Sequence, residues 1–259
     1  MIQRVYHQGV DFRIEDGCLL QMSNASTIQL EEIVIPSVFS SGERITSVGP
    51  LFCQLSFKKN PKIIIDDDIS IISKEAFRDT CVEEVVWPAS CTTIPYNCFF
   101  RSRITKITNI EHVTSIEDFA FFQSDIKEMV WPEKCSMIPL RCFASCTELT
   151  NISVPDSITE IAAGAFESCS FVNFRWPGGC REIPSRCFYG SMIETVDNLS
   201  SVVSIKDHAF ARCYSVADID LSSSIVSSVG HSAFFGVRRE RVSTPYYMNA
   251  DEFDSAFSF

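Results

Sequence analysis

The stretch VWPASCTTIPYNCF, residues 86–99, returns twice along the chain, as VWPEKCSMIPLRCF at residues 130–143 and as RWPGGCREIPSRCF at residues 175–188. The copies are 44 and 45 residues apart. Between them lie related segments without tryptophan, such as NIEHVTSIEDFAF at residues 109–121. Recurrence at a fixed spacing is the sequence signature of a repeat fold, so this period decides the architecture.

A shorter period lies within the long one, marked by a small residue followed by phenylalanine. The anchors are Phe77, Phe99, Phe121, Phe143, Phe166, Phe188, Phe210 and Phe234, with spacings of 22, 22, 22, 23, 22, 22 and 24 residues. A branched aliphatic residue lies five positions before each anchor. Further upstream, apolar residues such as Val85 and Trp87 alternate, which places their side chains on one side of a strand. One unit is therefore a strand, a tight corner, a second aliphatic rung and a corner anchored by phenylalanine.

A unit of about 22 residues cannot bury its own apolar face and must stack on its neighbours. The sequence predicts a mainly β repeat solenoid of about eight or nine coils, each of 22–24 residues. We expect an N-terminal cap over residues 1–32, the solenoid over residues 33–237, and a C-terminal cap or free tail over residues 238–259. The three tryptophans would lie on alternate rungs of one ladder, with the smaller Asn109, Val154 and Asn198 as inward neighbours.

These motifs resemble the BspA-like class of leucine-rich repeats, whose unit is approximately I-P-x-x-V-x-x-I-x-x-x-A-F-x-x-C-x-x-L. The segment VPDSITEIAAGAFESCSF, residues 154–171, matches that unit almost throughout, while the WP-containing coils and the use of Ile for Leu depart from it. The resemblance implies a right-handed leucine-rich-repeat stack with a parallel sheet along one face. It also implies a recognition role, often as an adhesin at the surface of bacteria or protists, and it brings no catalytic residues.

Composition narrows the classes of partner. With 46% hydrophobic residues the chain can form a core, and its net charge of −11 argues against nucleic acid or an anionic membrane as the main partner. No apolar stretch has the length of a membrane span, so we expect no membrane insertion. The N-terminus has no signal-peptide pattern, which favours the cytoplasm, whereas the family resemblance favours the cell surface or secretion.

Twelve cysteines are many for a chain of this size. Two classes replace small apolar residues of the other coils: Cys91, Cys135 and Cys180 stand where Val113, Ile158 and Val202 stand, and Cys98, Cys142 and Cys187 stand where alanine does. Cys81, Cys146, Cys169 and Cys213 follow an anchor phenylalanine at a corner. This register predicts reduced core cysteines. A disulfide ladder and a metal site are the alternatives, although no C-x-x-C pair is present.

The other chemically versatile residues favour structural roles. The four histidines have no metal-type spacing, and His112 and His208 are expected at exposed turns. The acidic run Asp66, Asp67 and Asp68 lacks the pattern of a calcium-binding loop and is expected to be a solvated turn. No phosphate-binding or hydrolase motif is present. We therefore predict a protein that is not an enzyme and has no catalytic, cofactor or metal site.

A binding surface is expected where strand side chains point away from the core. Two columns are predicted: Glu84, Lys106, Glu128, Asn151, Asn173, Thr195 and Asp218, and beside it Val86, Thr108, Val130, Ser153, Arg175, Asp197 and Asp220. The candidate partner-binding residues are Glu84, Lys106, Glu128, Arg175, Asp197, Asp218 and Asp220, and the acidic final coils predict a protein ligand that is basic there. Alternatives are a structural protein that forms homo-oligomers through its ends or faces, and the sensor domain of a larger system.

Overall fold

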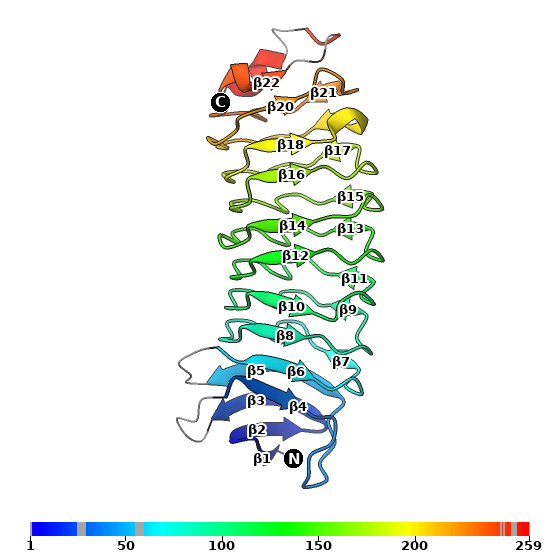
Figure 1. Ribbon diagram of the computed structural model, residues 1–259, viewed down its shortest axis with the longest axis vertical. Helices are drawn as coiled ribbons and strands as arrows, with labels where there is room; N and C mark the ends of the chain where they lie inside the picture. The colour runs from blue at the N-terminus through cyan, green and yellow to red at the C-terminus, as the bar shows by residue number, and fades with distance from the viewer. Residues whose placement is uncertain are drawn as a thin grey trace. The chain divides into compact units, whose positions relative to one another are not determined.

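The computed structural model describes residues 2–24, 30–54, 60–243, 245, 247–249 and 253–258. It divides into two compact units, Met1–Ile126 and Lys127–Phe259. Each is built mainly from short strands that pair in parallel from coil to coil, and the described residues form a β-solenoid fold of about eight turns with almost no helix (Figure 1). The predicted solenoid class is therefore confirmed.

The first unit begins with antiparallel strands and continues with parallel ones. Strands β1 (Ile2–His7), β2 (Val10–Glu15) and β3 (Cys18–Asn24) form antiparallel pairs, after which β3 pairs in parallel with β5 (Ser47–Gln54) and β5 with β7 (Ile71–Ile72). A parallel sheet joins β4 (Glu32–Ile35), β6 (Lys62–Ile65), β8 (Glu84–Val86) and β10 (Lys106–Thr108). The short β9 (Thr93–Ile94) pairs with β11 (Ser115–Ile116).

The second unit repeats the same two kinds of strand. The longer ones pair as β12 (Glu128–Val130) with β14 (Asn151–Ser153), β16 (Asn173–Arg175) with β18 (Thr195–Asp197), and β20 (Ile219–Asp220) with β22 (Val242–Ser243). The shorter ones pair as β13 (Met137–Ile138) with β15 (Glu160–Ile161), and β17 (Glu182–Ile183) with β19 (Ser204–Ile205) and β21 (Ser228–Val229). The predicted second rung of each coil is thus itself a parallel strand.

Stacked anchor phenylalanines form the centre of each unit. In the first, the ring centroids of Phe77 and Phe99 are 5.3 Å apart and those of Phe99 and Phe121 are 5.2 Å apart, with nearly parallel planes. In the second, an equivalent column is formed by Phe143, Phe166, Phe188, Phe210 and Phe234. All eight rings are fully buried. Because each ring covers the one before it, the column supplies the apolar burial that a single coil lacks.

The backbone around each anchor explains the small residue before it. The residues two before and two after every anchor, for example Glu75 and Asp79 around Phe77, have positive φ angles of 48–85°. The positive φ on both sides of each anchor turns the peptide groups along the stack. Phe77 N–H therefore donates to the carbonyl of Cys98, and Phe99 N–H donates to the carbonyl of Ala120. The coils approach closely here, and only alanine or cysteine occupies the position before the ring.

The tryptophan coils contain a feature that the sequence did not predict. The indole N–H of Trp87 donates to the carbonyl of Cys91 at 2.9 Å. Trp131 and Trp176 likewise donate to the carbonyl of the cysteine four residues later in the chain. The expectation that Asn109 and Asn198 lie inward beside the rings is wrong. Both have positive φ and are exposed, and their side-chain amides donate to the carbonyls of Trp87 and Trp176.

The inward positions of these coils are occupied by the residues that follow the asparagines. Ile110 and Leu199 are buried there, because a left-handed residue reverses the side on which the next side chain lies. Val154, the third expected inward neighbour, is only half-buried.

The C-terminal segment covers the last coil of the second unit. Phe257 stacks on Phe234 at 5.2 Å, and Phe253, which is fully buried, lies 5.9 Å from the same ring. Phe234 N–H donates to the carbonyl of Ala256, which replaces the next coil's backbone. Tyr246 and Phe259, two further aromatic residues of the expected C-terminal cap or tail, lie outside the described residues.

Candidate functional site

The outward side chains of the long strands form the candidate surface. In the second unit, the parallel register places Glu128 beside Asn151, Asn173 beside Thr195, and Arg175 beside Asp197. An isolated bridge continues the column from Thr195 to Asp218. The side chains between them, such as Met129 and Phe174, are buried. Alternation along each strand therefore presents the two predicted columns to solvent in this unit.

The first unit holds the start of both columns. Lys106 is exposed beside Glu84, which is half-buried. The Glu84 carboxylate lies 3.6 Å from the ammonium group of Lys62 and accepts a hydrogen bond from the Thr108 hydroxyl at 3.0 Å. Glu84 is thus already engaged by neighbouring strands, whereas the Lys106 side chain is free to meet a ligand.

Three predicted acidic residues share one depression in the second unit. Asp197, Asp218 and Asp220 line a hollow of about 260 Å³, together with Ser223 and Ser224. Hydrogen bonds from Ser222 lower the pKa of Asp220. The Asp220 carboxylate therefore stays ionised to a lower pH than an ordinary aspartate, and with Asp197 and Asp218 it forms a compact acidic patch at the C-terminal end of the columns.

Arg175 separates this acidic group from the earlier strands. Its guanidinium donates to the Asp156 carboxylate at 2.6 Å, and both side chains are more than half exposed. The same carboxylate oxygen accepts from the Gly178 N–H at 3.2 Å. The Arg175 hydrogen bond lowers the pKa of Asp156. Arg175 is therefore oriented by a turn of the preceding coil and not by its strand neighbour Asp197.

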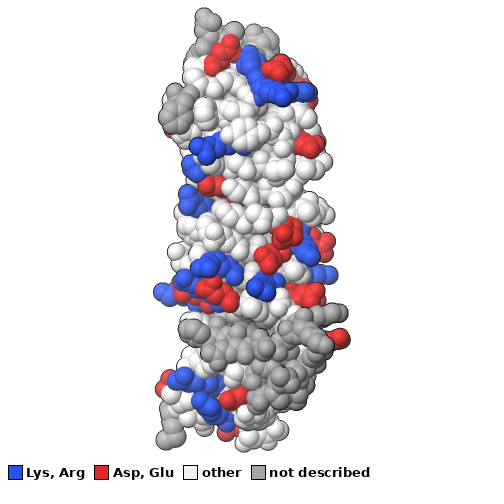
Figure 2. Space-filling model, turned by 90° about the vertical axis from the view of Figure 1, so that its left-hand side faces the viewer, with Lys and Arg blue, Asp and Glu red and all other residues white. Residues whose placement is uncertain are grey.

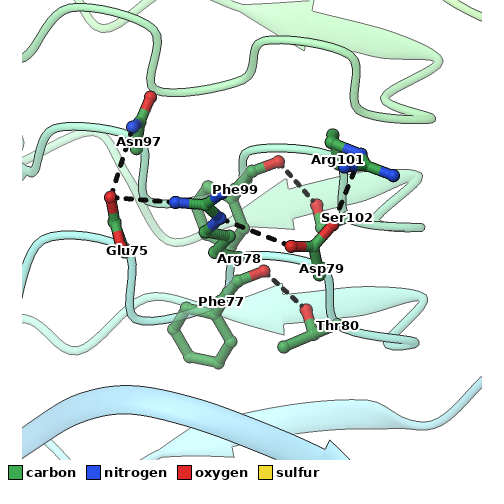
Figure 3. A network of polar contacts seen from close by, with 9 residues as sticks. All are labelled: Glu75, Phe77, Arg78, Asp79, Thr80, Asn97, Phe99, Arg101 and Ser102. Carbon is green, nitrogen blue, oxygen red and sulfur yellow. Dashed lines mark hydrogen bonds and ion pairs between the residues drawn. The ribbon is translucent and has the colours of Figure 1, made fainter.

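A polar network on the phenylalanine turns was not predicted from the sequence. In Figure 3 the Arg78 guanidinium lies between the carboxylates of Glu75 and Asp79, with N–O distances of 3.1 and 3.3 Å. Arg101 of the next coil contacts Asp79 at 3.4 Å, and the Asn97 amide donates to Glu75 at 3.4 Å. All but Arg78 occupy the positive-φ positions around Phe77 and Phe99. The sequence signal for this network is the shared register of these residues, two positions before and two after successive anchor phenylalanines, which places them on one surface.

Aromatic side chains accompany this network. The Arg78 guanidinium lies 4.9 Å from the ring centroid of Phe100, which stacks on Phe122 at 5.3 Å. Tyr96, which is 40% exposed, contacts Phe119 edge-on. On the side of the molecule seen in Figure 2, charged side chains gather in separate groups with uncharged surface between them. Mixed charged and aromatic surface of this kind is typical of protein interfaces.

The cysteines are structural. None of the eleven described cysteines forms a disulfide bond, and nine of them are buried, which agrees with the predicted core role. Burial raises the pKa of Cys135 to about 11 and that of Cys180 to about 12. Because a thiolate is the nucleophile and the metal ligand, these thiols are poorly suited to either chemistry at neutral pH. Among the described residues, no cluster of histidine, cysteine or acidic side chains could hold a metal ion.

The histidines and the acidic run are more engaged than expected. His112 is half-buried, and its Nε2 lies 3.0 and 3.1 Å from the carbonyl oxygens of Pro88 and Cys91, so its expected position as a solvated turn residue is wrong. His208 is also half-buried, in ring contact with His231. The Asp66–Asp68 run forms a turn in which Asp66 accepts from the Asp68 N–H, and Asp67 accepts from the Ala89 N–H.

Comparison with known proteins decides the family. The profile of the BspA type leucine rich repeat region matches residues 51–170 and 136–255, with six copies. The chain belongs to the BspA-type leucine-rich-repeat family. A search of curated proteins finds no significant match.

Solved structures agree on the fold. A leucine rich cell surface protein from Faecalibacterium prausnitzii is similar, with a TM-score of 0.60 and 20% identity, over 94% of this chain and 76% of that one. The pneumococcal vaccine antigen PcpA is similar with a TM-score of 0.52 and 13% identity, over 95% and 71% of the two chains. At these identities the likeness concerns the fold.

The structure adds one observation on location. None of the helices in the described part of the chain has the length and hydropathy needed to cross a bilayer. Nothing in the fold or in the comparisons supports the expected cytoplasmic location.

Proposed function

We propose that this BspA-type solenoid is a non-catalytic recognition module that binds a protein ligand through the outward columns of its long strands. The observation that carries the proposal is the shared register of β16, β18 and β20, which lines up Arg175, Asp197, Asp218 and Asp220 as exposed neighbours. Because the hydrogen-bonded ladder already fixes the backbone of these residues, binding does not have to order that backbone, which favours affinity. An extended, regularly spaced surface suits a protein ligand better than a small molecule.

Charge selects the kind of partner. The final strands present three carboxylates around one hollow, and the lowered pKa of Asp220 keeps the Asp220 carboxylate ionised. A lysine- or arginine-rich segment complements this patch and would be steered toward it at low ionic strength. We therefore propose that the partner is a basic protein surface or segment. We also propose the cell surface as the place of action, in keeping with the family and with the cell surface protein of F. prausnitzii that has a similar fold.

A displayed library of random peptides tests the proposal without a known partner. The library is selected separately on the wild-type chain and on the variant Asp197→Lys/Asp218→Lys/Asp220→Lys. Wild type is expected to enrich peptides rich in Lys and Arg whose binding weakens with added salt, and the variant is not. Enrichment of the same peptides on both chains would refute the role of this surface.

Self-association is a second candidate, supported by one sheet edge. β1 is the outermost strand of its five-stranded sheet, and it exposes Ile2 by 49% and Tyr6 by 63%. An exposed edge strand with apolar side chains is a template for pairing with another strand. Sedimentation of the wild type and of Tyr6→Lys over a range of concentrations tests it. A dimer of wild type that Tyr6→Lys abolishes supports assembly, and a monomer throughout rejects it.

A further inference from the structure

A hollow on the phenylalanine-turn side of the second unit has a different chemistry from the strand columns. It measures about 300 Å³ and is lined by Ser168, Tyr189, Gly190, Met192, Arg212 and Tyr214, among others. Ser168, Gly190 and Arg212 hold the same positive-φ position in three successive coils. The hollow therefore exists because glycine leaves empty the place that a side chain occupies in the coils before and after it.

The hollow carries an uncompensated positive charge. Arg186, one turn away, is neutralised by Glu167 at 2.6 Å. Arg212, by contrast, has no carboxylate within 4.0 Å among the described residues, and none of the residues that line the hollow is acidic. In a chain with a net charge of −11, this arrangement favours an anionic group. The planar guanidinium matches a carboxylate with two parallel hydrogen bonds.

Two tyrosines supply flat walls beside that charge. The Tyr189 ring is held by the guanidinium of Arg186 at 3.8 Å from its centroid, and Arg212 lies 5.6 Å from the same ring. Tyr214 is 74% exposed. Its Cε1 lies 2.9 Å from the point where a Cβ on Gly236 would stand, so only glycine there leaves room for this ring. The Tyr189 ring is thus held by arginines of its own and the next coil, while the Tyr214 ring occupies the space that Gly236 leaves beside it.

We propose that this hollow binds a carboxylate-bearing sugar unit. Arg212 would bind the carboxylate, the tyrosine rings would face the C–H groups of the pyranose, and the hydroxyls of Ser168 and Ser215 would meet the ring hydroxyls. A saccharide fits better than an acidic peptide. An extended peptide binds by pairing its backbone with a strand edge or by lying in a longer groove. This hollow is short and is rimmed by hydroxyl groups. The site is independent of the strand columns and of the protein partner proposed above.

Saturation-transfer NMR of the full chain with glucuronate, glucose and N-acetylglutamate as probes tests the proposal. Gly190→Gln fills the hollow with the side chain that the first unit carries at the equivalent Gln123, and a Cβ there meets only the Ser168 hydroxyl, at 3.5 Å. Arg212→Gln removes the charge and leaves the hollow open. Arg101→Gln, at the same turn position in the first unit, is the matched control.

Glucuronate is expected to bind wild type and Arg101→Gln, with roughly tenfold or greater weakening in each of the other two variants. Glucose is expected to bind at least tenfold more weakly than glucuronate, because it lacks the carboxylate. Equal binding of glucuronate to wild type and to both hollow variants would overturn the site. Binding of N-acetylglutamate without glucuronate would overturn the saccharide as its ligand. Binding of glucose as tight as that of glucuronate, or no binding of glucuronate to wild type, would overturn recognition of a carboxylate-bearing sugar.

Discussion

The side-chain amide of Asn198 donates a hydrogen bond of 2.8 Å to the backbone carbonyl of Trp176, one coil earlier. Asn109 repeats the bond to Trp87 at 2.6 Å. Each asparagine has a left-handed backbone and ends the long strand that follows a tryptophan coil. Each asparagine therefore ties its own coil to the tryptophan coil before it, at the place where the long strand ends.

The asparagine bond has a separable energetic contribution. Asn198→Ala removes both the hydrogen bond and a residue that tolerates positive φ, whereas Asn198→Gly removes the bond alone. We expect the alanine variant to lower the free energy of unfolding by about 2 kcal/mol and the glycine variant by about 1 kcal/mol. Urea unfolding measures both, with the exposed strand variant Asn173→Ala as control. Equal losses for alanine and glycine would show that backbone conformation contributes nothing.

The residue before each anchor phenylalanine must be small but need not be cysteine. Cys187→Ala places at this position the residue found in the neighbouring coils at Ala165 and Ala209. The free energy of unfolding should therefore change by less than about 1.5 kcal/mol. Cys187→Leu adds volume where Phe166 N–H reaches the Cys187 carbonyl, and it should cost about 1–3 kcal/mol. Thermal unfolding distinguishes the two. A large loss with alanine would mean that the thiol itself is required.

Buried thiols should make stability fall at alkaline pH. The pKa of Cys135 is raised to about 11 and that of Cys180 to about 12, from an ordinary value of 9.0. Between pH 9.0 and these raised pKa values, the two thiols lose their protons in the unfolded chain but keep them in the folded chain. The free energy of unfolding therefore falls as pH rises above about 9. The double variant Cys135→Val/Cys180→Val, with the residue found at Val113 and Val202, should show a flatter decline. Urea midpoints from about pH 8 to about pH 10 measure it, and parallel declines would contradict the assignment.

Glu167 joins two arginines of neighbouring coils. Its carboxylate lies 2.6 Å from Arg186 and 3.6 Å from Arg141, and its side chain is 16% exposed. Glu167→Gln should destabilise the chain by about 1–2 kcal/mol, because two cations lose their shared anion in a partly desolvated place. Asp156→Asn, which breaks the exposed pair with Arg175, should lower the free energy of unfolding by less than Glu167→Gln does, because solvent screens that pair. Chemical unfolding of both variants checks this order; a larger loss at Asp156 would contradict it.

The periodic apolar positions made the fold predictable. Phe77, Phe99 and their successors recur so regularly that the stacked column followed from spacing alone, and Cys187 was recognised as a small core residue because alanine takes its place elsewhere. The outward columns followed in the same way from strand alternation. These features depend on whether a side chain points into the core or toward solvent, and the repeat spacing in the sequence indicates that direction.

Local backbone conformation was harder to predict. Asn198 was assigned inward because an ideal strand would place it there, but a left-handed residue turns it outward and brings Leu199 into the core. The same conformation on both sides of each anchor creates a turn surface in each unit, which carries Arg78 and Asp79 in the first unit and the Gly190 hollow in the second. Positive φ at non-glycine residues leaves little trace in composition, so this second surface became evident only in the structure.

Recognition through the acidic end of the strand columns is tested most directly by calorimetric titration of a selected basic peptide. The wild-type chain is compared with Asp197→Lys/Asp218→Lys/Asp220→Lys and with Glu133→Lys/Glu148→Lys/Glu160→Lys, which reverses three exposed carboxylates of the same unit outside the columns. We predict that the control triple retains most of the wild-type affinity, whereas the column triple loses roughly tenfold or more. Equal affinity for wild type and the column triple, or equal losses in both triples, would contradict the proposed site.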